Sequence, residues 1–454
     1  MLRVAGVQDT WWEVLPEQAR QLPVELAQID AYLDDERFIA PWREVFADRL
    51  GRPSVPVETL LRLLYLKHRY QLGYETLCRE VTDSLSWRRF CRIPLTSPVP
   101  HPTTLVKLMS RGSAQTVEQL NAALLGKLVE DKLMRCRKLR VDTTVIEADI
   151  DHPTDADLLE HGVRKLGRLV RRIKDAGGAR RTRFRDRSRS AGRRLKEISR
   201  TLRRRTGQAM GEIDRLTGEI ATMARATLRD VATVERNARR ALGKRPSGRL
   251  ARVVAELAET AAGTRRLLEQ TALRLTGIRT IPDRLVSLAD PDARPIRKGK
   301  PQHPTQFGYT ALVAEDERCF VVDHQVNRGN PPDAPQLVPS VERVATLTGR
   351  PPGTVVADRG FGTAANDRAL AELGVQRIGL QRNGTPGKAR REHEHTRPFR
   401  RMRNWRVGIE ARISHLKRSF GFRRIRLRRL AGAQTWAGLG IFAYNLHRMT
   451  VSVR

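Results

Sequence analysis

Residues 138–149, KLRVDTTVIEAD, decide the fold class of this chain. The stretch alternates in polarity and is rich in Val, Ile and Thr, which predicts a β-strand. Mostly helical patterns precede it, and a long helical pattern follows, from about residue 153 to 280. Beyond that, the predicted order is strands, helix, strand, helix, strand and helix. The chain is therefore expected to form an α/β domain with a mixed sheet, interrupted by helices after its first strand.

This pattern divides the chain into three parts. Residues 1–135 are expected to form a helical N-terminal domain. Residues 136–152 and 282–454 are expected to form the two halves of a split α/β domain, and residues 153–281 a basic helical insertion between them. Short helices joined by tight turns in the first part fit DNA binding by a helix-turn-helix or, about equally well, dimerisation by helix packing.

Two features of the insertion predict its structure. Apolar seams on both sides of a turn signal at Lys244–Gly248 predict an antiparallel helical hairpin. Between His161 and Thr206, nineteen Lys or Arg stand against three acids. This arginine-rich stretch is expected to be a helix, or an arm that is disordered without nucleic acid. For the hairpin, the alternatives are a structural spacer and an arm that grips DNA, and the adjoining positive charge favours the arm.

The composition limits the partners and the compartment. A formal net charge of +35 favours a polyanion, usually nucleic acid, over the alternative of a merely solvated basic surface. No signal peptide and no run of ~18 apolar residues is visible, so no membrane partner is expected. The four cysteines form no CxxC pair, which argues against a zinc finger and fits a reducing compartment.

Two aspartates occupy positions where a sheet can place a functional site. Asp142 lies within the predicted strand, where a charged side chain is costly to bury without a partner or a metal ion. Asp358 follows the apolar run Val355–Ala357 and precedes a glycine turn, at the carboxyl end of a strand. The alternatives are an exposed or arginine-paired Asp142 and a turn-forming Asp358.

A basic helix is predicted within NWRVGIEARISHLKRSFGFRR, residues 404–424. Arg406, Glu410 and Lys417 fall on one face of such a helix. The alternative for Glu410 is an ordinary ion pair on a surface helix. Aromatic residues interleave with the arginines here and could stack on bases or fill the core; they are Phe399, Trp405, Phe420 and Phe422.

Three carboxylates in so basic a chain point to metal-dependent chemistry on DNA phosphates. Cleavage of a phosphodiester needs a positioned oxygen nucleophile and neutralisation of charge, and two divalent ions ~3.5–4 Å apart supply both. Magnesium prefers hard oxygen ligands, so a few carboxylates suffice. A rival metal site at His393 and His395 lacks further ligands at metal spacing.

Several blocks of the sequence resemble the DDE transposases of bacterial insertion sequences, specifically the insertion-sequence-5 type. The blocks include VDTTVIEADIDHPTDADLL from residue 141, VVADRGFG from residue 355 and the helical run at residues 60–93. The C-terminal block is similar to a signature of Tyr, Arg, Glu and Lys with two, three and six intervening residues. Arg406, Glu410 and Lys417 fit this spacing, and Arg403 replaces the tyrosine.

The resemblance implies an RNase H-like catalytic domain that binds two Mg²⁺ or Mn²⁺ ions through Asp142, Asp358 and Glu410. In such enzymes water cleaves a phosphodiester at the element's end, and the freed 3′-hydroxyl attacks target DNA. The DNA-contacting residues it implies are Arg403, Arg406, Lys417 and Arg418. It also implies a bacterial cytoplasmic protein, associated with the nucleoid, that acts on element ends as a homodimer.

Two other functions remain open at the level of sequence. One is a catalytically inactive, sequence-specific DNA-binding protein derived from a transposase. The other is a basic structural protein that coats nucleic acid without sequence preference. Magnesium-dependent nicking separates the first from an active transposase, and a preference for terminal inverted repeats excludes the second.

Overall fold

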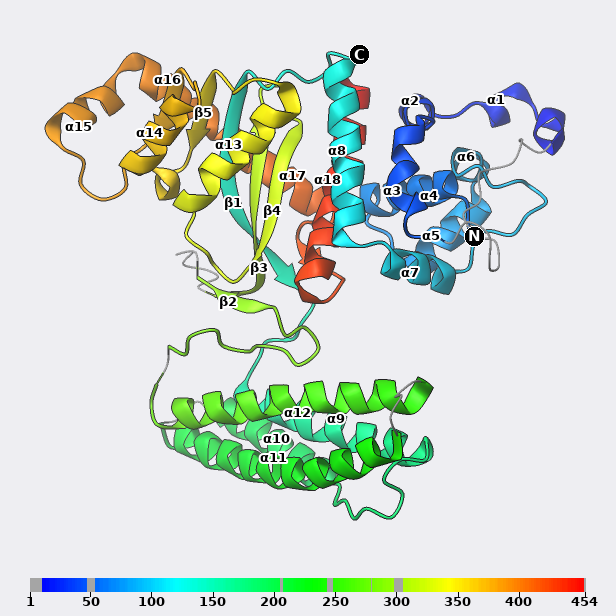
Figure 1. Cartoon of the computed structure of the whole chain (residues 1–454), viewed down its shortest axis with the longest axis vertical. Coiled ribbons are helices and arrows are strands. Elements are labelled where there is room, and N and C mark those ends of the chain that lie inside the picture. Colours follow the sequence, from blue (N-terminus) through cyan, green and yellow to red (C-terminus); the bar gives the residue numbers. More distant parts are fainter. Residues whose placement is uncertain are drawn as a thin grey trace. The chain divides into compact units, whose positions relative to one another are not determined.

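The computed structural model forms two compact units, which are described separately (Figure 1). The first contains Met1–Asp149 and Tyr309–Arg454, and the second contains Ile150–Gly308. The residues that the structure describes are 10–46, 54–204, 207–242, 248–278, 280–297 and 305–452. No helix among them is long and apolar enough to cross a membrane.

A mixed sheet forms the centre of the first unit. Its strands are β1 (Lys138–Ala148), β3 (Gln306–Asp316), β4 (Val321–Arg328), β5 (Thr354–Ala357), β6 (Arg377–Leu380) and β7 (Arg424–Ile425). The sheet runs in the order β3-β1-β5-β6, β4 pairs antiparallel with β3, and β7 pairs parallel with β1. The predicted α/β class, mixed sheet and interruption after the first strand are confirmed.

The register of β1, β5 and β6 fixes where their ends meet. All three strands are parallel, and Val141 of β1 is opposite Ala357 of β5, which is opposite Leu380 of β6. All four residues of β5 are buried, as expected for a parallel strand covered on both faces. The residue after Val141 and the residue after Ala357 therefore occupy neighbouring positions on one face.

Helices of the C-terminal half surround the sheet. They are α13 (Ala334–Thr348), α14 (Ala364–Glu372), α15 (Lys388–His395), α16 (Arg397–Arg406), α17 (Gly408–Ser419) and α18 (Arg429–Ser452), with the short 3-10 helix η4 (Arg359–Phe361). Helix α16 packs on β5 and β6, and α17 packs on β1. These contacts bring the predicted basic helix against the strands that carry Asp142 and Asp358.

The N-terminal helices share their core with the sheet. They are η1 (Thr10–Val14), α1 (Glu17–Arg20), α2 (Val24–Tyr32), η2 (Glu36–Phe38), α3 (Ala40–Arg43), α4 (Val57–Arg69), α5 (Tyr74–Asp83), α6 (Leu85–Phe90), α7 (Pro102–Arg111) and α8 (Ala114–Glu130). Helix α18, buried almost all round from Thr435 to Leu446, packs against α4, α8 and β4. By its contacts the expected domain 1–135 is thus part of the same compact unit as the sheet.

The second unit is a helical bundle. It contains α9 (Asp155–Asp175), α10 (Ser188–Thr201), η3 (Leu202–Arg204), α11 (Gly207–Leu242), α12 (Gly248–Leu275) and the short strand β2 (Arg294–Ile296), which pairs with residues 306–308. Helices α11 and α12 pack together, as the predicted hairpin requires. The expected turn at Lys244–Gly248 lies, except for Gly248, outside the described residues.

The apolar seams of the bundle explain its packing. Val254, Leu257 and Ala261 of α12 are buried in one cluster with residues of α9 and α11. The arginine-rich stretch forms most of α9, turns and a loop at residues 176–187, η3, and helix α10, where Ala191 and Ile198 are buried. Of the two alternatives for this stretch, the structure therefore has the helical one over most of its length.

A buried acid at the end of β3 makes stability depend on pH. Asp316 Oδ1 accepts hydrogen bonds from the backbone N–H groups of Arg318 and Phe320, both at 2.9 Å. Burial raises the pKa of Asp316 to about 7. Its folded pKa thus exceeds the unfolded value, so the contribution to stability is complete at acid pH and is lost as pH rises toward 7.

The substitution Asp316→Asn is expected to remove this pH dependence. Between pH 4 and pH 7 the free energy of unfolding of the parent chain should fall relative to the variant by up to ~1.4 kcal/mol per pH unit. Urea unfolding of both proteins at several pH values measures the difference. Glu342→Gln, an exposed change on α13, is the control. Parallel stability profiles of parent and Asp316→Asn would contradict the prediction.

Candidate active site

Asp142 and Asp358 lie side by side on neighbouring strands. Asp142 follows Val141 in β1, Asp358 follows Ala357 at the end of β5, and Val141 and Ala357 are register partners. Adjacent strands are ~4.8 Å apart, and residues at one register step point to the same face. The two carboxylates that lie 216 positions apart in sequence therefore share one part of the sheet surface.

Local backbone contacts hold both aspartates in place. Asp142 Oδ1 accepts a hydrogen bond from the N–H of Thr143 at 2.7 Å. Asp358 caps the 3-10 helix η4 and accepts from the N–H of Gly360 at 2.8 Å. The turn-forming role considered for Asp358 is present, and it also orients this carboxylate at the strand end.

A further carboxylate, missed by the sequence reasoning, lies next to Asp358. A Cβ atom added at Gly360 would be 2.9 Å from Asp333 Oδ2 and 3.1 Å from Asp358 Oδ1, so the two carboxylates flank the same point. Asp333 Oδ1 is buried without a hydrogen-bond partner in the described part of the chain. Asp333 lies in the sequence GNPPDAPQL, residues 329–337, directly before α13, and that position was the available signal.

Arg406 connects Asp142 with Glu410. Its Nη1 is 3.3 Å from Asp142 Oδ2, and its Nη2 is 3.1 Å from Glu410 Oε1. The Asp142 side chain is 14% exposed and the Glu410 side chain 60% exposed. One guanidinium thus spans from the sheet to the first turn of α17, and both the i,i+4 ion pair and the arginine-paired Asp142 considered from sequence are present.

The carboxylates are not gathered as a ready metal site. Within residues 10–46, 54–204, 207–242, 248–278, 280–297 and 305–452, no three His, Cys, Asp or Glu side chains are close enough to hold one ion. Arg406 occupies the space between Asp142 and Glu410 that a cation would share. Still, the donor set consists of hard carboxylate oxygens, one of them an unpartnered buried oxygen of Asp333, which suits a divalent ion.

The single helix expected to carry Arg406, Glu410 and Lys417 is wrong in one respect: it breaks at Val407, so Arg406 ends α16 while Glu410 and Lys417 lie on α17. Arg140 of β1 causes the break: its Nη1 donates to the Trp405 carbonyl at 3.0 Å, an oxygen that a continuous helix would pair four residues on. The guanidinium lies so close to Gly408 that any Cβ there would overlap it. A larger residue at the start of α17 would therefore have to displace the Arg140 guanidinium from its contacts.

A buried ionic triad anchors this junction to the sheet. Glu315 of β3, whose side chain is 0% exposed, contacts Arg140 Nε at 2.9 Å and Arg412 Nε at 2.8 Å. Arg140 also lies 5.0 Å from the centroid of the Trp405 ring. The triad ties β1, β3 and α17 together and so sets the position of Glu410 relative to Asp142. The sequence reasoning missed all three members.

The predicted DNA-contacting cations lie on α16 and α17. Arg403 and Arg418 are exposed, and Lys417 is half-buried. The aromatic side chains do not form a stacking surface, because Phe399, Phe420 and Phe422 are buried. This confirms the core alternative for these phenylalanines.

The histidine rival is not supported. The ring of His393 lies against Phe399 at 5.4 Å between centroids, and His395 Nδ1 is 3.5 Å from Arg400 Nη2. Neither belongs to a set of three metal-ligating side chains within the described residues. Cys78, Cys91 and Cys136 are buried thiols, and Cys319 is half-buried.

Two segments of the chain match known protein families. Residues 15–111 match the Transposase domain (DUF772) family, and residues 271–446 match the Transposase DDE domain family. A Rhizobium meliloti protein described as "Uncharacterized protein ORF8 in nfe locus" is 29% identical over 165 residues, which are 35% of this chain and 75% of that protein. No solved structure matches the chain. The second match contains Asp358 and Glu410, and Asp142 precedes it.

Proposed function

We propose, for a chain that contains a transposase domain and a transposase DDE domain, that it binds the ends of an insertion sequence and cleaves and transfers their strands. The observation that supports this most is the pairing of Asp142 and Asp358 at one register step of β1 and β5. Glu410 reaches the same place through Arg406. The sheet with its helices agrees with an RNase H-like DDE domain.

The acids would hold two Mg²⁺ or Mn²⁺ ions. Asp142, Asp358 and Glu410 are the proposed ligands, and Asp333 is an additional oxygen donor beside Asp358. When bound, such ions lower the pKa of a water nucleophile and neutralise charge on the scissile phosphate. The chain itself contributes the position of the two aspartates on a rigid sheet and the placement of Glu410 by the buried triad.

Arg406 is proposed to alternate between the two carboxylates and the DNA phosphates. In the present structure its guanidinium neutralises Asp142 and Glu410. With divalent ions on these carboxylates, the Arg406 guanidinium would be free to contact the phosphates of the end DNA. Arg403, Lys417 and Arg418 lie on the same two helices and are proposed to bind further phosphates.

The spacing of residues in the C-terminal block supports a narrower assignment of the family. Arg406, Glu410 and Lys417 support assignment to the insertion-sequence-5 type, with Arg403 in place of the tyrosine. Action on two ends supports a homodimer, and DNA as substrate supports a location on the bacterial nucleoid in the cytoplasm.

Cleavage of end DNA by the full chain tests the proposal. A duplex with the terminal inverted repeat should be nicked at the element boundary with Mg²⁺ or Mn²⁺, and not with EDTA. One observation favours a catalytically inactive DNA-binding protein instead: Arg406 stands between Asp142 and Glu410, and the described acids form no three-ligand set. Specific binding of the repeat without nicking in either metal would establish that alternative.

The change Arg406→Gln separates the two roles of Arg406. Without DNA, the variant should bind Mn²⁺ at least several-fold more tightly, because the competing cation on Asp142 is gone. With DNA, its cleavage rate should fall, because a phosphate contact worth roughly 1–3 kcal/mol is lost. Titration calorimetry measures the first effect and single-turnover cleavage the second. Arg403→Gln is the control for metal affinity, and unchanged Mn²⁺ affinity in Arg406→Gln would contradict the competition.

A further inference from the structure

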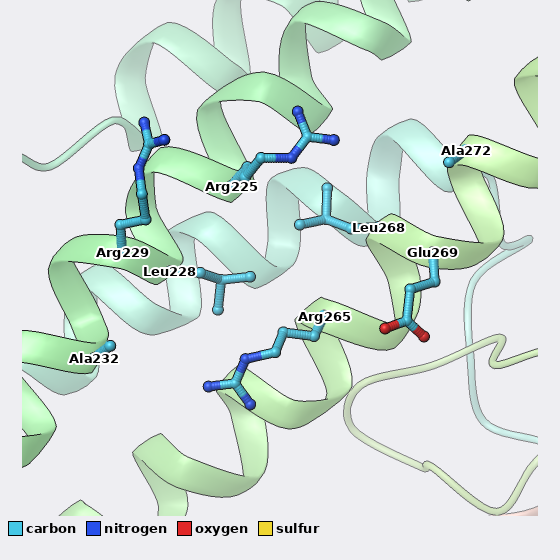
Figure 2. Close-up of a pocket in the computed structure, with 8 residues that line it drawn as sticks. All are labelled: Arg225, Leu228, Arg229, Ala232, Arg265, Leu268, Glu269 and Ala272. Carbon is cyan, nitrogen blue, oxygen red and sulfur yellow. The ribbon is translucent and has the colours of Figure 1, made fainter.

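An open groove of about 490 Å³ runs between α11 and α12 on the helical bundle (Figure 2). Arg225 and Arg229 line it from α11, and Arg265 lines it from α12. Its floor is apolar, with Leu228 and Leu268 between the two helices. The groove is shallow and exposed, which suits an extended polyanion better than an enclosed small molecule.

The three groove arginines have no carboxylate partner among the described residues, although Glu269 of α12 also lines the groove. On the same helix, Arg215 contacts Glu212 at 2.6 Å, and Arg239 contacts Glu235 at 2.6 Å. Within the described part of the chain, the guanidiniums of Arg225, Arg229 and Arg265 make no ion pair or hydrogen bond. Their positive charge is therefore available to an external anion.

The positive face continues along α11 beyond the groove. Arg236 and Arg240 follow Arg225 and Arg229 at intervals that keep all four on one side of the helix, within ~60°. Both are exposed, and neither has an ion pair among the described residues. From Arg225 to Arg240 this arginine stripe is ~22 Å long, at 1.5 Å per residue.

We infer that the groove and the arginine stripe bind the sugar-phosphate backbone of duplex DNA. The inference rests on the proposed function, since it assigns the insertion a share of the same substrate. Guanidinium groups match phosphate geometry, and one DNA strand presents a phosphate every 3.4 Å along the axis, so the stripe spans ~6 of them. Contacts of this kind set position without reading sequence, so the groove should bind duplex DNA with or without a terminal repeat.

Two matched double variants of the full chain test the inference. Arg225→Gln/Arg229→Gln removes two unpaired groove charges, and Arg215→Gln/Arg239→Gln removes two paired charges from the same helix. The probe is a 30-bp duplex without the terminal repeat, titrated between 50 and 200 mM salt. The slope of log K against log salt should become shallower by ~1.8 in the groove variant and by much less in the control. Arg265→Gln on α12 should make the slope shallower by ~0.9, and this variant is the test if the double variant unfolds.

Three results would overturn the inference. They are an equal loss of slope in both double variants, a groove effect on single-stranded RNA that exceeds the effect on duplex DNA, and a change of oligomeric mass with unchanged DNA binding. Nicking of a repeat-containing duplex separates the two proposals. Normal nicking with an unchanged slope in the groove variant refutes the groove alone. A changed slope in a chain that never nicks keeps the groove and refutes the catalytic proposal.

Discussion

Asparagine in place of Asp142 or Asp358 is expected to lower metal-dependent cleavage of an end duplex by at least ~10³-fold. Each change removes a proposed charged oxygen ligand, and metal stabilisation of phosphoryl chemistry is worth several kcal/mol. Glu410→Gln should act in the same direction. Binding of the end duplex should stay equal or become tighter, because each change removes a negative charge from the surface proposed to face phosphates. Gel-based cleavage and equilibrium binding measure the two effects separately.

Asp149→Asn is the matched control for these variants. Asp149 follows β1, and its exposed carboxylate contacts Arg424 rather than the other acids. Its loss should leave cleavage within about twofold, because surface changes away from a site rarely exceed ~0.5 kcal/mol. Full activity of any one of the three acid variants would remove that residue from the mechanism, and loss of activity in Asp149→Asn would show that the acids were misassigned.

Glu315→Gln is expected to destabilise the first unit by roughly 3–5 kcal/mol. The change leaves Arg140 and Arg412 without the buried anion that both contact, and an uncompensated buried charge carries a cost of this size. Chemical denaturation of the full chain measures the loss, with Glu342→Gln on the surface as the control. Cleavage should fall as well, because the triad positions the start of α17.

A second variant keeps this prediction open to contradiction. In Glu315→Gln/Arg412→Gln, one buried cation is removed together with the anion. The double variant should lose about 1–3 kcal/mol less stability than the sum of the losses in the two single variants, as for other coupled neighbours. Additive effects, or a loss below ~1 kcal/mol in Glu315→Gln, would show that solvent reaches the triad and that it does not hold the junction.

Much of the architecture could be predicted from local pattern. The alternating stretch at 138–149, the apolar run before Asp358 and the seams of α12 each encode their element within a short window. Their order was enough to predict a mixed sheet interrupted after its first strand. The same windows placed Asp142 within a strand and Asp358 at the end of another, and parallel pairing then brought them together.

Contacts between distant residues decided the details of the candidate site. The break between α16 and α17 comes from Arg140, which lies 265 positions before the carbonyl that it binds. Helical periodicity in residues 404–424 therefore could not predict the break. Burial of Phe420 and Phe422 likewise depends on packing, because spacing alone does not separate core from surface aromatics.

The sequence by itself determined the type and order of elements and the identity of three candidate acids. Only the tertiary structure decided that Arg406 lies between Asp142 and Glu410, that Asp333 stands beside Asp358, and that Glu315 anchors the junction. The physical reason is the separation along the sequence over which each interaction acts. Hydrophobic periodicity and turn chemistry act between residues only a few positions apart. Charge pairing and burial depend on which distant side chains the fold brings into contact.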